Sequence, residues 1–70
     1  MKISARNALK GKVVKLIKGA VNSEVVIEIA KGIQVTSIVT NDAVKELKLA
    51  KGKPAYAVIK ASSVMIGVDE

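Results

Sequence analysis

Cysteine and histidine are both absent from this chain of 70 residues. Disulfides and metal sites built on thiolate or imidazole ligands, the usual staples of small domains, are therefore excluded. A chain of this length forms one domain at most, here residues 1–70, and it buries a smaller fraction of its surface than a longer chain does. Because 50% of the residues are hydrophobic, we expect an obligate homo-oligomer whose interfaces supplement the core.

Aromatic residues are almost absent as well, since Tyr56 is the only one. Twelve Lys and Arg against six Asp and Glu give a formal charge of +6, which attracts anions of any kind. Nucleic-acid-binding modules of this size usually interleave aromatic stacking platforms with their basic residues. The shortage of aromatic residues therefore argues against nucleic-acid binding. Because of the positive charge, a small OB-fold nucleic-acid-binding protein is nevertheless kept as the alternative function.

Long apolar runs and catalytic motifs are missing too. No run approaches the ~20 apolar residues of a membrane span, and the first residues lack the apolar stretch of a secretory signal, so we expect a cytoplasmic protein. The sequence has no GxxxxGK[ST] motif and no serine beside a candidate base. We therefore expect a binding protein and not an enzyme.

The apolar pattern predicts β-strands in the first half of the chain. Residues 7–19 are interpreted as one long strand bent at Gly11, where a missing side chain permits a bulge or a close backbone approach. A helix is the competing interpretation, because lysines recur every two or three residues, but the β-branched residues favour a strand. Residues 23–30 and 33–39 alternate around a tight turn at 30–32 and predict a hairpin.

A short helix and two further strands are expected in the second half. The segment Thr40-Asn41-Asp42 suits a helix N-terminus, and residues 43–47 have helical spacing. Residues 55–60 predict a strand, residues 61–63 interrupt it, and residues 64–68 resume the pattern. This order predicts an all-β fold, a five-stranded OB-like barrel with one short helix between strands 3 and 4.

The segment Ser4-Ala5-Arg6-Asn7 concentrates hydrogen-bond donors: a hydroxyl, a guanidinium fork, a side-chain amide and several backbone N–H groups. A tetrahedral oxyanion needs converging donors and no acceptors, because its charge must be compensated when water is removed. The simpler interpretation is an ordinary N-terminal arm with a solvated arginine.

Two further segments could supply donors. Lys60-Ala61-Ser62-Ser63 offers an ammonium group and two hydroxyls with no acid nearby, although a strand that ends in a turn explains it equally well. Thr40-Asn41-Asp42 lies at an expected helix N-terminus, whose dipole favours anions. Helix capping is the simpler role for Asn41 and Asp42.

In combination, Ser4-Ala5-Arg6-Asn7, Leu9-Lys10-Gly11-Lys12-Val13 and Lys60-Ala61-Ser62-Ser63-Val64 closely resemble the motifs of the molbindins, small proteins built from one molybdate-binding (Mop) domain. The resemblance covers essentially the whole chain. It implies an OB-like fold, a hexamer arranged as a trimer of dimers, and oxyanions held at subunit interfaces for intracellular molybdenum storage and homeostasis.

The resemblance also implies which residues bind the oxyanion: Ser4, Ala5, Arg6, Asn7, Thr40, Lys60, Ala61, Ser62 and Ser63. The chain departs from some relatives at Ala43, where they have a serine. Molybdate is fully deprotonated at neutral pH, so a site made only of donors suits it, and neither main motif contains Asp or Glu. Tungstate has nearly the same size and should bind too. Sulfate is also a bare dianion, so discrimination against it would have to come from cavity size. An assembly module without any ligand is the third interpretation.

Overall fold

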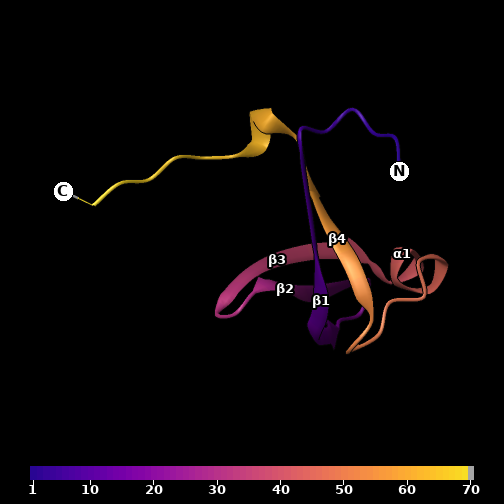
Figure 1. Cartoon of the computed structure of the whole chain (residues 1–70). Helices are drawn as coiled ribbons and strands as arrows, with labels where there is room; N and C mark the ends of the chain where they lie inside the picture. The colour runs from indigo at the N-terminus through magenta and orange to yellow at the C-terminus, as the bar shows by residue number, and fades with distance from the viewer. Residues whose placement is uncertain (70) are drawn as a thin grey trace.

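Within residues 1–69, which the computed structural model describes, the chain forms four strands, one α-helix and one 3₁₀ turn. In chain order these are β1 (Asn7–Lys18), β2 (Asn22–Ala30), β3 (Ile33–Thr40), α1 (Asn41–Glu46), β4 (Pro54–Ile59) and η1 (Ala61–Ser63). The strands form one antiparallel sheet in the order β3-β2-β1-β4 (Figure 1). The all-β prediction and the short helix between the third and fourth strands are confirmed.

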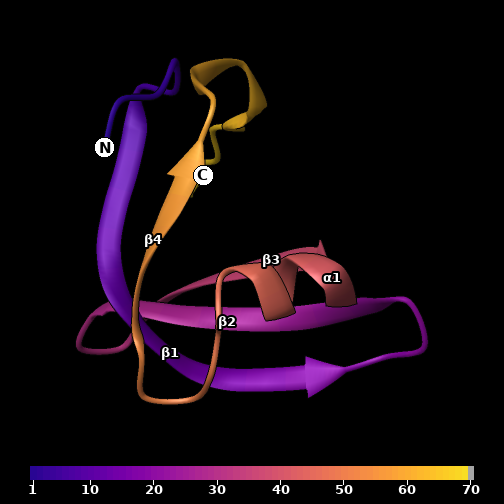
Figure 2. The same ribbon diagram turned by 90° about the vertical axis from the view of Figure 1, so that its right-hand side faces the viewer.

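Strand β1 is the longest element and curls the sheet. Its residues 7–12 pair with β4, and its residues 12–18 pair with β2. The register with β2 shifts between Val13 and Lys15, and such a bulge bends a strand and increases its twist. Figure 2 shows β1 turning from a steep course beside β4 to a flat course beside β2. The result is a curled half-barrel, and the strand interpretation of this segment, as against the helix, is confirmed.

Gly11 explains how closely β1 and β2 approach one another. A Cβ atom at this position would collide with the backbone carbonyl of Glu28 and would lie only 2.7 Å from Ile27 Cγ2. Any side chain would therefore push the two strands apart. The expected close approach at Gly11 is confirmed, whereas the bulge comes slightly later in the strand.

The buried core lies inside the curl and is small. It consists of Val13, Val25, Ile27 and Ala57, and the half-buried apolar residues packed against it are Leu16, Ile29, Val35, Val39, Leu49 and Ala55. Several large apolar side chains, including Ile17, Val21 and Ile38, are exposed in the protomer. So much exposed apolar surface on a small chain favours association, and the oligomer stays a prediction.

The expectation of a fifth strand is wrong, and the described chain forms an open half-barrel of four strands instead of a closed barrel. Residues 64–69 belong to no helix or strand, and all of them are exposed. The backbone N–H of Ser63 donates to the carbonyl of Lys60 (2.9 Å) and that of Val64 to the carbonyl of Ala61 (3.3 Å). This turn directs the chain away from the sheet, so a segment with a strand-like pattern has no edge beside it with which to pair.

Helix α1 begins at Asn41, directly after Thr40, and contacts β2 and β3. The hydroxyl of Thr40 accepts a hydrogen bond from the backbone N–H of Ala43 at 3.0 Å, which makes Thr40 the N-cap. The helix thus begins slightly earlier than residues 43–47 predict. Among the described residues, no helix has the length and apolar character that crossing a membrane requires.

Candidate functional site

The pairing of β1 with β4 brings the two main donor segments together. Asn7 lies opposite Ile59 in the register, and its side-chain Nδ2 donates to the Ile59 carbonyl at 3.3 Å. The N-terminal donor segment (residues 4–7) and the C-terminal donor segment (residues 60–63) therefore leave the sheet at the same end, as Figures 1 and 2 both show. Segments more than fifty positions apart in sequence become neighbours in a single protomer.

The donors at this end are open to solvent in the protomer. Ser4, Arg6 and all of residues 60–63 are exposed, and Ala5 and Asn7 are half-buried. The C-terminal donor segment forms η1, whose N-cap position is Lys60, and no side chain caps the turn. The hydroxyls and charged groups are therefore available to an external acceptor. Because solvent screens exposed charges strongly, a second surface over this end would strengthen every contact to an anion.

Thr40 does not join these two segments within the protomer. It lies opposite Asn22 at the far end of β3, next to the part of β2 that pairs with the last residues of β1. Asn7, by contrast, is the first residue of β1. The sheet therefore separates Thr40 from the paired donor segments by most of the length of β1.

Asn41 has a structural role in the protomer. Its side-chain Oδ1 accepts a hydrogen bond from the Ser23 hydroxyl at 2.5 Å, and its Nδ2 donates to the Gly19 carbonyl at 3.0 Å. Its backbone N–H also donates to the Val21 carbonyl at 2.8 Å. Asn41 therefore ties the start of α1 to the turn between β1 and β2. The expected cap belongs to Thr40, and the side chain of Asn41 braces the loop instead.

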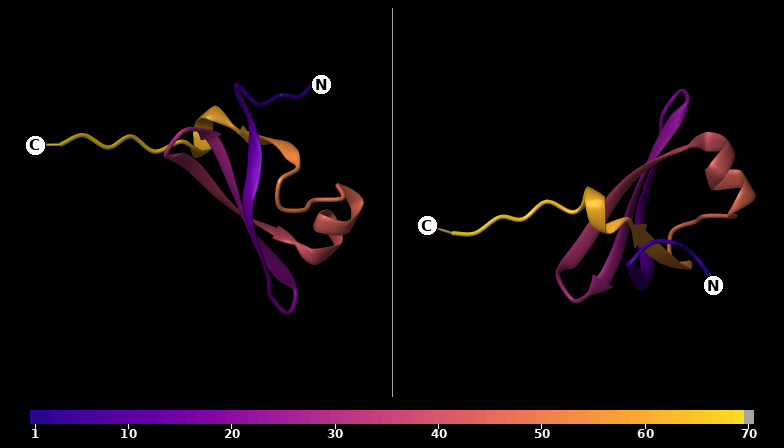
Figure 3. Two further views of the ribbon diagram at one scale, coloured as in Figure 1. Left: turned by 60° about the horizontal axis from the view of Figure 1, so that its bottom comes forward. Right: turned by 90° about the horizontal axis from the view of Figure 1, so that it is seen from above.

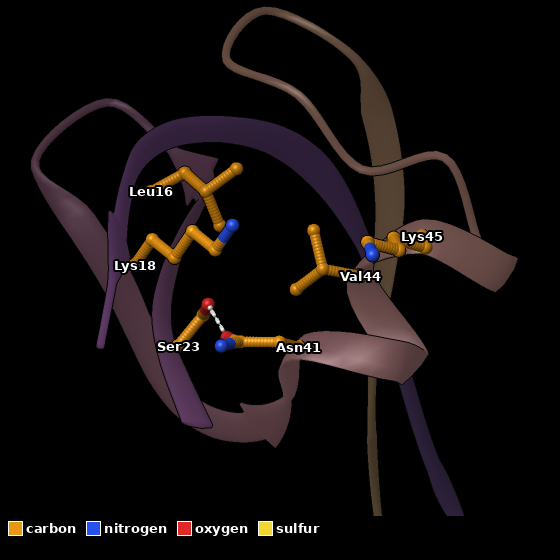
Figure 4. A pocket seen from close by; sticks show the side chains of 6 residues that line it. All are labelled: Leu16, Lys18, Ser23, Asn41, Val44 and Lys45. Atoms are coloured by element: carbon orange, nitrogen blue, oxygen red, sulfur yellow. Dashed lines mark hydrogen bonds between the residues drawn. The ribbon is translucent and has the colours of Figure 1, made fainter. Parts of the chain in front are cut away.

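A small pocket beside this brace was missed by the sequence analysis. It has a volume of about 100 Å³ and is lined by Leu16, Lys18, Ser23, Asn41, Val44 and Lys45. Figure 4 shows the Ser23–Asn41 hydrogen bond at one edge of the pocket, below Leu16 and Lys18, with Val44 and Lys45 on the other side. The alternation of side chains along β2 could have revealed Ser23, because Ser23 lies two and four residues before Val25 and Ile27 and therefore occupies the same buried face.

The electrostatics of the paired donor segments are uniformly positive. Arg6 and Lys60 provide the charge, and neither segment contains a carboxylate. Among the described residues, no group of three or more His, Cys, Asp or Glu is arranged to hold a metal ion. The chemistry available at this end is hydrogen-bond donation to an anion.

Comparisons with known proteins point to one family. A family model described as "TOBE domain" matches residues 3–66. A probable molybdenum-pterin-binding protein of Haemophilus influenzae is 59% identical over 69 residues, which cover 99% of this chain and all of that protein.

Two solved structures share the fold and much of the sequence. MopII from Clostridium pasteurianum superposes with a TM-score of 0.88 and 54% identity, covering 96% of this chain and all of that one. The cytoplasmic molybdate-binding protein ModG, in a form with molybdate bound, superposes with a TM-score of 0.92 and 49% sequence identity. The match covers 99% of this chain and 49% of the ModG chain.

Proposed function

Because this chain belongs to the TOBE-domain family, among the molybdenum-pterin-binding proteins called molbindins, we propose that it binds molybdate reversibly. The observation that carries the proposal is the Asn7–Ile59 pairing, which sets the two donor segments side by side. Support also comes from ModG, which is described as a molybdate-binding protein and has molybdate bound in its structure.

Each part of the proposed site contributes a different kind of donor. Arg6 gives two parallel N–H bonds to a pair of oxygens, and Lys60 gives a mobile point charge. The hydroxyls of Ser4, Ser62 and Ser63 turn to meet the remaining oxygens. The backbone N–H groups of Ala5 and Ala61 complete the set, and Asn7 positions the first segment through its bond to β4.

The proposed site forms where subunits meet, in a homohexamer built as a trimer of dimers. The exposure of the donors in the protomer supports this, because burial under a second chain would remove the water that competes for the anion. Thr40 contributes its hydroxyl at a second class of site or to a neighbouring subunit, since it is remote from Asn7 in its own chain. Anion binding and assembly then stabilise one another by linkage.

The proposed biological role is intracellular storage and homeostasis of molybdenum, in the cytoplasm. Reversible binding needs only donors, and the segments contain no group that would act as a catalytic base. The description of ModG as cytoplasmic supports the location. Tungstate, a dianion of nearly the same size, binds as an analogue, and a monoprotonated phosphate lacks the acceptor that it needs.

Isothermal titration with sodium molybdate at moderate salt tests the proposal. A saturable heat that tungstate reproduces and sulfate does not reproduce is the expected result. A folded oligomer that gives no saturable heat refutes molybdate binding. Binding of single-stranded oligonucleotide that falls steeply with salt, and that molybdate does not compete away, would instead support the nucleic-acid alternative.

A further inference from the structure

Half of the net charge of the chain lies on nine consecutive residues, from the last turn of α1 to the residue before β4. We call residues 45–53 the basic loop. It contains one acidic residue, Glu46, and four lysines: Lys45, Lys48, Lys51 and Lys53. Its net charge is therefore +3, against a formal +6 for the whole chain. Such a concentration of one sign on one short segment attracts anionic surfaces.

The basic loop lies at the opposite end of β4 from the proposed anion site. It leads into Pro54, the first residue of β4, whereas the donor segments meet beside Ile59, the last residue of that strand. In both views of Figure 3, α1 and the chain that follows it occupy the side of the molecule opposite the C-terminal segment. A partner that covers the basic loop can therefore leave the donor segments open.

Backbone hydrogen bonds hold the basic loop against the sheet. The N–H of Gly52 donates to the Val13 carbonyl at 2.7 Å, and the N–H of Val13 donates to the Lys53 carbonyl at 2.9 Å, which fastens the loop to β1. The N–H of Lys53 also donates to the Ala50 carbonyl at 3.1 Å and closes a turn around Lys51. A loop that is already ordered in this way loses little conformational entropy when a partner binds.

One of the four lysines is used inside the loop. The Nζ of Lys53 donates to the Lys48 carbonyl at 2.8 Å and to the Leu47 carbonyl at 3.2 Å. These carbonyls lie at the C-terminal end of α1, where the helix dipole favours a cation. Lys53 is half-buried, whereas Lys45, Lys48 and Lys51 are exposed. The exposed lysines of the loop are therefore the ones that a partner can reach.

Lys48 has a backbone conformation that does not suit a lysine. Its φ is 53°, in the left-handed region, and within residues 1–69 it is the only residue other than glycine with a positive φ. Glycine is the usual residue at this position after a helix, because a Cβ atom raises the energy of the left-handed conformation. A strained backbone at an exposed charged residue points to a function of its side chain.

An apolar side chain lies among the exposed lysines. Leu47 directly precedes Lys48 and is 62% exposed, and the N–H of Lys48 donates to the Lys45 carbonyl at 3.1 Å, so these residues share one turn. The loop contains no aromatic residue on which a base could stack. A single leucine is also a small anchor for a membrane, which takes a broad apolar face. A polypeptide can offer both carboxylates for the lysines and an apolar side chain for the leucine.

We propose that the basic loop is a docking surface for an acidic polypeptide segment of another protein, with carboxylates on both sides of an apolar residue. The carboxylates pair with Lys45, Lys48 and Lys51, and the apolar side chain contacts Leu47. Contacts between exposed charges accelerate association and weaken as the salt concentration rises. The proposal is independent of the anion site, because no residue of the basic loop belongs to the donor segments.

Fluorescence anisotropy tests the docking with a labelled synthetic peptide that has glutamates on both sides of a central leucine. Saturable binding at low salt is expected. A loop variant in which glutamine replaces the exposed lysines should bind about tenfold more weakly or worse: Lys45→Gln, Lys48→Gln and Lys51→Gln. The matched control variant loses the same charge from exposed positions outside the loop and should stay within about threefold: Lys10→Gln, Lys15→Gln and Lys31→Gln. Glycine in place of the leucine of the peptide should weaken binding severalfold.

Lys48→Gly separates docking from a structural role of this lysine. Glycine relieves the left-handed conformation and should raise the midpoint of thermal unfolding, whereas the loss of the ammonium group should weaken peptide binding severalfold. A higher midpoint with unchanged affinity overturns the proposal. So do the absence of saturable peptide binding, equal losses in the loop and control variants, and tighter binding of an oligothymidylate or a phosphatidylserine vesicle than of the peptide at the same salt concentration.

Discussion

The two ends of β1 carry similar residue types but use them differently. At the Lys18 end, serine, asparagine and lysine lie around a small pocket, and the Ser23 hydroxyl is bonded to Asn41. At the Asn7 end, serine, asparagine, lysine and arginine gather at the surface. Among the described residues, the side-chain hydrogen bond found there is the one from Asn7 to Ile59. Polar groups that satisfy one another stabilise a fold, and polar groups left open to solvent can bind a ligand.

Removing charge from the Asn7 end should have the largest effect on anion binding. Arg6→Ala and Lys60→Ala each delete charge-assisted hydrogen bonds, so the Kd for molybdate should rise by roughly tenfold to a hundredfold per substitution. Isothermal titration measures the change. Lys31→Ala removes the same charge as Lys60→Ala from an exposed turn and should leave the Kd within about twofold. Equal losses from Lys31→Ala and Lys60→Ala would show that only net charge matters.

Replacing one serine at each end of β1 should affect stability at the Lys18 end and molybdate binding at the Asn7 end. Ser23 is 2% exposed and donates to Asn41. Ser23→Ala leaves the half-buried Oδ1 of Asn41 without this donor and should lower the free energy of unfolding by about 1–2 kcal/mol. Ser62 is exposed, so Ser62→Ala should leave stability unchanged and weaken molybdate binding severalfold. Denaturant unfolding and titration of both variants measure the contrast. A Ser23→Ala protein with native stability and a raised Kd would reverse the assignment of the two ends.

The N-cap of α1 should show the smallest effect. Thr40→Ala removes the acceptor for the Ala43 N–H and should cost about 1 kcal/mol of stability, as measured by thermal unfolding. Thr40→Ser keeps the hydroxyl and should retain most of that stability. If Thr40 also donates to an anion in the oligomer, Thr40→Ala should weaken binding at one class of site and Thr40→Ser should not. Equal destabilisation by both variants would show that the methyl group, and not the cap, is important.

Local pattern predicted most of the fold because local chemistry determined it. The alternation of apolar and polar side chains in residues 23–30 and 33–39 correctly predicted the β2–β3 hairpin. Gly11 correctly predicted a close approach of two strands. The fifth strand could not be predicted correctly because residues 64–68 have the composition of a strand, but the turn at η1 directs them away from both edges of the sheet. Ser23 was missed because its partner, Asn41, is distant in sequence.

The sequence by itself determined the inventory of this protein: a basic chain with few aromatics and no cysteine or histidine, two donor segments free of carboxylates, and strands recognisable from their period. Only the tertiary structure decided which donors meet, because the β1–β4 register sets Asn7 opposite Ile59 and leaves Thr40 at the other end of the sheet. The physical reason is that residue type and spacing fix what a side chain can donate, whereas its neighbours depend on backbone pairing between distant segments.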